Sequence, residues 1–99
     1  MPMMQAPVIQ AVQQLLQERG IEKKVGERLG DYVARGLRVS PAQAERLLEA
    51  LHEGKTVEEA TAEAGIAAGG REAMLLNEIA RTVGAALGML AGLTGKLRT

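Results

Sequence analysis

The residue pair best suited to chemistry in this sequence is Glu49 and His52, a carboxylate and an imidazole three positions apart. On a helix, side chains at this spacing lie on one face. The same Glu-x-x-His spacing occurs in di-iron helical bundles, where glutamates from other helices complete the metal site. Glu45 and Glu53 are close in sequence, and a symmetric dimer would double the set. One interpretation is a ferritin-like metal-binding helical protein, and the simpler one is an exposed histidine on an acidic helix.

Other residue types that enzymes use are scarce. His52 is the only histidine, Ser40 is the only serine and there is no cysteine. Ser40 precedes Pro41, a position where its hydroxyl caps a helix and is not free as a nucleophile. No glycine-rich segment follows a predicted strand, as a phosphate-binding loop would require. We therefore expect no enzyme activity, no catalytic residue, no metal ligand and no cofactor.

The composition predicts one small domain with an unusual core. The chain has 99 residues, no Phe and no Trp, and Tyr32 is its only aromatic residue. Aromatic side chains usually carry much of a core's buried area, so aliphatic residues must supply it here. Twelve glycines accompany them. This combination favours helices that approach closely, or subunits that share a core.

Charge and hydropathy limit which classes of partner and which cellular compartment the sequence predicts. The formal net charge is zero, so the chain lacks the excess of basic residues that is typical of a protein that binds nucleic acid over its whole surface. Residues 1–10 show no signal-peptide pattern. The longest nearly uncharged stretch, residues 82–95, is shorter than the about 20 residues that a membrane-spanning helix needs. These patterns predict a cytoplasmic protein without a transmembrane segment.

Apolar periodicity and helix-end signals predict an all-α fold of about five helices, a small orthogonal helical bundle with a long C-terminal helix. Capping boxes are expected at Ser40 to Gln43 and at Thr56 to Glu59. Residues 1–70 would form a four-helix compact region, and residues 71–99 a long apolar, glycine-zipper helix of the same domain. The second helix would place Val25, Leu29, Tyr32 and Val33 on one side and stop at Gly36. The predicted helices cover residues 7–19, 22–35, 41–53, 57–64 and 71–94.

The last predicted helix has two apolar faces. One is a leucine-rich stripe expected to contact the protein's own core. The other carries three glycines at spacing four, more than a quarter-turn away. Each glycine inside a helix costs about 1 kcal/mol relative to Ala, and close approach by a second helix is the usual compensation. The stripe is Leu75, Ile79, Val83, Ala86, Leu90, Leu93 and Leu97. The predicted interface residues are Ala80, Gly84, Leu87, Gly88, Leu90, Gly92 and Leu93.

The sequence does not determine which surface contacts this glycine face. Gly26, Gly30 and Ala34 repeat the spacing of four in the second predicted helix. The two glycine ridges could dock on each other, or each could meet a partner subunit. A third interpretation is a poorly ordered C-terminal tail.

Residues 40–66 resemble the first part of a bacterial helix-turn-helix unit, with Gly65 as the turn glycine and Ile66 as the apolar residue after it. The resemblance implies a small DNA-binding protein of phage or plasmid type. A recognition helix should follow within a few residues, yet the chain continues with Ala and Gly at 67–70. Residues 39–70 carry two basic and six acidic side chains. Their net charge is therefore negative, and the phosphates of DNA would repel it.

These observations favour a non-catalytic α-helical assembly or adaptor protein that acts through helix–helix contacts. Its expected partner is a protein, either a second copy of the chain or a larger protein. Nucleic acid is the less favoured partner. The helix-turn-helix DNA-binding protein is the first alternative, and the ferritin-like metal-binding protein is the second.

Overall fold

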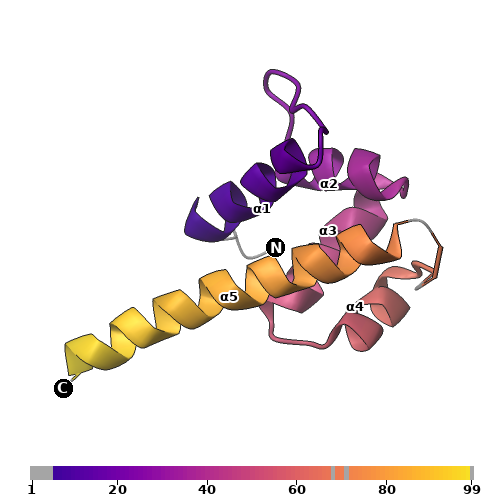
Figure 1. Ribbon diagram of the computed structural model, residues 1–99. Helices are drawn as coiled ribbons and strands as arrows, with labels where there is room; N and C mark the ends of the chain where they lie inside the picture. Colours follow the sequence, from indigo (N-terminus) through magenta and orange to yellow (C-terminus); the bar gives the residue numbers. More distant parts are fainter. Residues whose placement is uncertain (1–5, 68, 71, 99) are drawn as a thin grey trace.

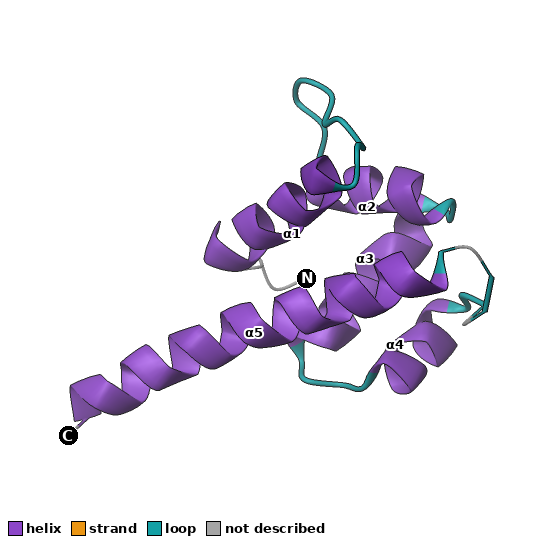
Figure 2. Ribbon diagram, in the orientation of Figure 1, coloured by secondary structure: helices purple, strands orange, loops and turns teal. Residues whose placement is uncertain are grey.

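The protein is all-helical, as predicted. The computed structural model describes residues 6–67, 69–70 and 72–98, with side chains up to Met89, and these residues contain no strand. The two regions that the sequence predicted, 1–70 and 71–99, join in one core, because α5 lies along α1 and contacts α3 (Figure 1). The five helices, shown by type in Figure 2, are α1 (Ala6–Glu18), α2 (Leu29–Leu37), α3 (Pro41–His52), α4 (Val57–Ala64) and α5 (Ala73–Arg98).

Two helices begin where the capping boxes predicted. The Ser40 hydroxyl accepts a hydrogen bond from the Gln43 backbone N–H, and the Gln43 side chain accepts one from the Ser40 N–H. Thr56 and Glu59 form the same reciprocal pair at the start of α4. Each box satisfies backbone donors that the first turn of a helix leaves without partners. These short-range bonds fix where α3 and α4 begin.

The second helix differs from its prediction. Residues 22–28 are not helical, and α2 begins only at Leu29. Val25 is fully exposed at a turn instead of buried, and Gly26 has a φ of 75°, a left-handed conformation that breaks a helix. The prediction that Gly36 ends the helix is also wrong, because α2 continues to Leu37 and ends at Arg38 with a φ of 59°.

Gly36 has a packing role within α2. A Cβ at this position would lie 3.2 Å from Leu16 Cδ2 and 3.2 Å from Ile21 Cδ1. The missing side chain therefore lets α2 lie close to the end of α1. Packing, not helix termination, accounts for this glycine.

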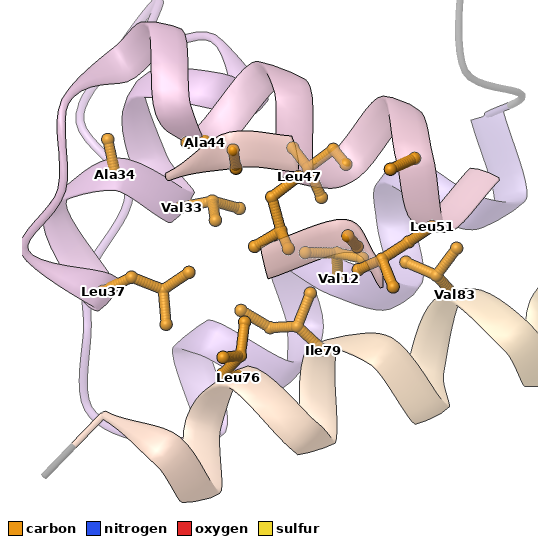
Figure 3. Close-up of a cluster of buried hydrophobic side chains, with 14 of the residues drawn as sticks. Val12, Val33, Ala34, Leu37, Ala44, Leu47, Leu51, Leu76, Ile79 and Val83 are labelled. Carbon is orange, nitrogen blue, oxygen red and sulfur yellow. The ribbon is translucent and has the colours of Figure 1, made fainter. Parts of the chain in front are cut away.

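The core is aliphatic and is built by all five helices. Tyr32, the single aromatic residue, is fully buried in it. Leu76, Ile79 and Val83 point from α5 into the cluster that holds Val12 and Leu47 (Figure 3). The remaining fully buried large side chains are Val8, Leu16 and Val33.

The predicted stripe of the last helix is confirmed where its side chains are described. Ile79, Val83 and Ala86 are buried and Leu75 is half-buried. Leu76 is also buried, although the predicted stripe omitted it. The stripe members Leu90, Leu93 and Leu97 lie outside the described side chains. None of the described helices combines the length and hydropathy of a membrane span.

Candidate interaction site

The C-terminal half of α5 extends past the other four helices (Figure 1). At 1.5 Å per residue, the 26 residues of α5 measure about 39 Å. Among its described side chains, the buried ones run from Leu76 to Ala86, Leu87 is half-buried, and Gly88 and Met89 are exposed. Up to Met89, the last described side chain, the helix therefore packs on the body of the protein from Leu75 to Leu87.

The predicted interface residues fall into three groups. Gly84 and Gly88 are exposed, and Ala80 and Leu87 are half-buried. The others, Leu90, Gly92 and Leu93, lie outside the described side chains. A Cβ at Gly84 or at Gly88 would meet nothing within 4 Å. No described part of the chain therefore covers the glycine face of α5.

The alternative in which the two glycine ridges dock on each other is wrong. Gly26 belongs to the loop between α1 and α2, so the helix that would carry this ridge does not extend that far. Gly30 faces α3, where a Cβ would lie 2.8 Å from Cγ of Glu45. The spacing of four between Gly26 and Gly30 is thus not a helical ridge.

Three predicted interface residues, Ala80, Gly84 and Leu87, form one wall of a groove beside α5. The other wall comes from the end of α3 and the turn that leads into α4. The groove encloses about 370 Å³ and its walls are mostly apolar. The remaining lining residues are Leu51, Gly54, Lys55, Thr56, Val57 and Arg81.

The turn that forms the second wall is set by local features. Gly54 has a φ of 91°, which reverses the chain after α3, and the Thr56 capping box starts α4 two residues later. A Cβ at Gly54, like one at Gly84, would meet nothing within 4 Å. Both walls therefore expose backbone at a glycine, and a helix carrying small residues could approach them closely.

Glu49 and His52 do not come together with further ligands. The described residues contain no group of three His, Cys, Asp or Glu side chains placed to hold a metal ion. Glu49 lines a separate hollow between α3 and α4. The buried Nε2 atom of His52 has no hydrogen-bond partner among the described residues. The geometry offers the ferritin-like interpretation no further support.

The segment that resembles a helix-turn-helix unit forms α3, the following turn and α4. Gly65 ends α4 with a φ of 71°, a left-handed C-cap. The next helix is α5, whose Leu76 and Ile79 are buried in the core. The resemblance stays a prediction, and the helix in the position of a recognition helix serves as a core helix.

Sequence reasoning missed a loop, residues 19–28, which we call the basic loop. The Arg35 guanidinium donates to both carboxylate oxygens of Glu27 at 2.7 Å and to the Glu22 carbonyl at 2.6 Å. The Tyr32 hydroxyl donates to the Ile21 carbonyl. Two side chains of α2 therefore hold the backbone of the basic loop. Gly20 and Gly26, six residues apart, are the sequence signal that could have indicated a loop here.

The Arg35–Glu27 contact leads us to predict how the stability of the protein changes at acidic pH. Hydrogen bonding to Arg35 lowers the pKa of Glu27 to about 2, below its ordinary value. The ionised carboxylate therefore stabilises the folded state at pH values above the ordinary pKa, and this stabilisation is lost as the pH falls through about 2. Glu27→Gln should unfold at lower urea concentration than the wild type at neutral pH. The difference should shrink as the pH falls from about 4.5 to about 2.

Urea titrations at several pH values measure this effect. Glu22→Gln is the matched control, because Arg35 contacts the backbone carbonyl of Glu22 and not its side chain. An unchanged gap between Glu27→Gln and wild type at every pH would show that the carboxylate charge is not what stabilises the loop.

Comparison with known proteins adds no relative. No family model, no curated protein and no solved structure matches the chain.

Proposed function

We propose that this protein is a non-catalytic α-helical assembly protein whose α5 associates with α5 of a second copy. The observation that carries the proposal is the exposure of Gly84 and Gly88 on a helix whose opposite side is already buried in the core. Each glycine costs a helix interior about 1 kcal/mol relative to Ala. No described part of the chain contacts the helix surface at these two glycines, so no contact among the described residues offsets that cost.

Small residues on a helix allow a second helix to approach closely, and the close approach gains van der Waals contact. The groove beside α5 continues this surface, because Gly84 belongs to both. A helix crossing near Gly84 and Gly88 would contact Leu87 and reach Val57 on the far wall. The proposed contact surface therefore extends beyond the two glycines.

A second copy is the partner that needs the fewest assumptions. Two-fold contacts use the same patch on both subunits, and an exposed glycine face that meets its own copy satisfies this condition. The small aliphatic core gives a further reason. A chain of this size buries only about two-thirds of its unfolded surface, and paired α5 helices would add buried apolar area to each subunit.

Gly88→Leu tests the proposal. The added side chain should push the paired helices apart and weaken association by about tenfold or more, which corresponds to about 1.4 kcal/mol. Helix content should stay equal or rise, because Leu is the better helix former. Sedimentation equilibrium over a range of concentrations measures the association, and far-ultraviolet circular dichroism measures the helix content.

Met89→Leu is the control. Met89 is 71% exposed on the same helix and points about 100° away from Gly88 and about 140° away from Gly84, so its replacement places the same leucine side chain outside the proposed interface. It should leave association within about twofold of wild type. A wild type that is monomeric at every concentration, together with a Gly88→Leu variant that is only more stable, would contradict self-association through this face.

A further inference from the structure

The basic loop, residues 19–28, is a projection that side chains of α2 hold by hydrogen bonds. It extends away from the body of the molecule between α1 and α2 (Figures 1 and 2). Arg35 and Tyr32 hold its backbone, and the Arg35 guanidinium lies 5.6 Å from the Tyr32 ring centre. Because these contacts already order the loop, a partner that binds it would not have to supply that ordering.

The tip of the basic loop combines an apolar side chain with free positive charge. Val25 is fully exposed, and Lys24 and Arg28 are exposed beside it. The one acidic side chain that Arg35 binds, Glu27, is only 8% exposed, so it contributes little to the loop's outer surface. The projection therefore presents cations around a small apolar centre, which suits an anionic protein surface.

Opposite charges are segregated within this neutral chain. Residues 19–38 have six basic and three acidic side chains, whereas residues 39–70 have two basic and six acidic ones. The second segment contains α4, which contacts α3 and α5 but neither α1 nor α2 among the described helices. The basic loop and α4 lie on opposite sides of the molecule (Figure 1). Because they lie on opposite sides, the basic loop and the acidic α4 do not neutralise each other within one copy.

A hollow between α3 and α4 provides a surface with a small excess of negative charge, because its lining has three glutamates and two basic side chains. It encloses about 410 Å³. Lys55 is already bound by Glu53 and Glu63, and this pairing raises the pKa of Lys55. Glu49 and the buried Ala50 also line the hollow. Arg46 completes the lining.

We propose that the basic loop of one copy docks in the α3–α4 hollow of a second copy. The complementary charges belong to the same chain and face opposite directions, so each copy offers a donor surface and an acceptor surface. Such a contact is head-to-tail, and it extends to further copies until a ring closes. A nucleic acid or an anionic membrane would complement the charge of the loop alone and would not contact the hollow. The contact does not depend on α5.

Ionic strength separates this contact from the α5 contact. Charge-driven association weakens with salt, whereas apolar helix pairing does not. In the Gly88→Leu background, raising the salt from about 50 mM to about 500 mM should weaken association by about tenfold or more. Salt-independent association in that background would contradict the proposal, even if the α5 contact is correct. Sedimentation velocity at both salt concentrations measures the effect.

A charge swap identifies the two surfaces. Lys24→Glu/Arg28→Glu reverses the exposed charges of the loop, and Glu49→Lys/Glu63→Lys reverses those of the hollow. At low salt each variant alone should lose the salt-sensitive association, because its two surfaces then carry like charges. An equimolar mixture should recover it, since the reversed loop of one variant matches the reversed hollow of the other.

Three further results complete the test. Circular dichroism verifies that the variants fold, and Lys24→Glu with Glu63→Lys replaces the double variants if one of those unfolds. A mixture that stays dissociated would overturn the assignment of the hollow. Duplex DNA or anionic phosphatidylserine vesicles that bind the wild type at low salt, in the absence of salt-sensitive self-association, would overturn the second copy as the partner.

Discussion

Replacing Ile79 by Ala is expected to lower the free energy of unfolding by about 2–5 kcal/mol. Ile79 is fully buried and points from α5 into the cluster around Val12 and Leu47 (Figure 3). The substitution removes buried methyl and methylene groups and leaves a cavity that rigid helices fill only in part. For a single domain, this loss is a large fraction of a total stability of about 5–15 kcal/mol. Urea unfolding followed by circular dichroism measures it.

Met89→Ala is the control for Ile79→Ala. Met89 lies on the same helix but is 71% exposed, so its replacement should change the free energy of unfolding by no more than about 0.5 kcal/mol in the monomer. Equal, small effects of both substitutions would show that α5 contributes little to the core. Residues 1–70 would then carry the stability alone, and the shared core described here would be wrong.

Replacing Gly36 by Leu is the second change with a large expected effect. A Cβ there would lie 3.2 Å from atoms of Leu16 and Ile21 and 3.5 Å from Cδ2 of Leu75. A leucine needs more room still, so α2 must move away from α1. Overpacking of this kind costs about 1–3 kcal/mol, more than the gain of about 0.8 kcal/mol in helix propensity. Thermal unfolding should show a lower midpoint.

Gly88→Leu is the matched comparison at an open site. The same substitution there meets nothing within 4 Å in the described chain, so in the monomer it should raise stability by about 0.8 kcal/mol through helix propensity. Opposite signs at Gly36 and Gly88 are therefore expected at concentrations low enough to dissociate any oligomer. A stabilising Gly36→Leu would show that α1 and α2 can separate without loss.

The sequence alone determined the features that depend on neighbours within about four residues. The Ser40 and Thr56 capping boxes predicted two helix starts correctly, because the bonds that form them join residues three apart. The stripe through Ile79 and Val83 predicted the buried side of α5 from helical spacing alone. The glycines at 84 and 88 were visible as a second face for the same reason.

Residues 22–28 show where local patterns failed. Their composition permits a helix, and Val25 fits an apolar stripe with Leu29. The loop forms instead because Arg35, eight residues beyond Glu27 and thirteen beyond Glu22, holds their carboxylate and carbonyl oxygens. Tyr32 adds a bond to a residue eleven positions away. Contacts at such separations depend on how α2 packs, which no helical period records.

Each candidate site likewise has one part that the sequence predicted and another that depends on tertiary packing. The spacing of Ala80, Gly84 and Leu87 marked one wall of the groove, but the other wall, with Leu51 and Val57, exists only because the turn after α3 lies beside α5. The charge bias of residues 19–38 and 39–70 is a sequence property, whereas their separation onto opposite sides is a property of the fold. Sequence fixes which side chains share an element, because helical geometry is local. Packing between elements decides which of those faces is left exposed.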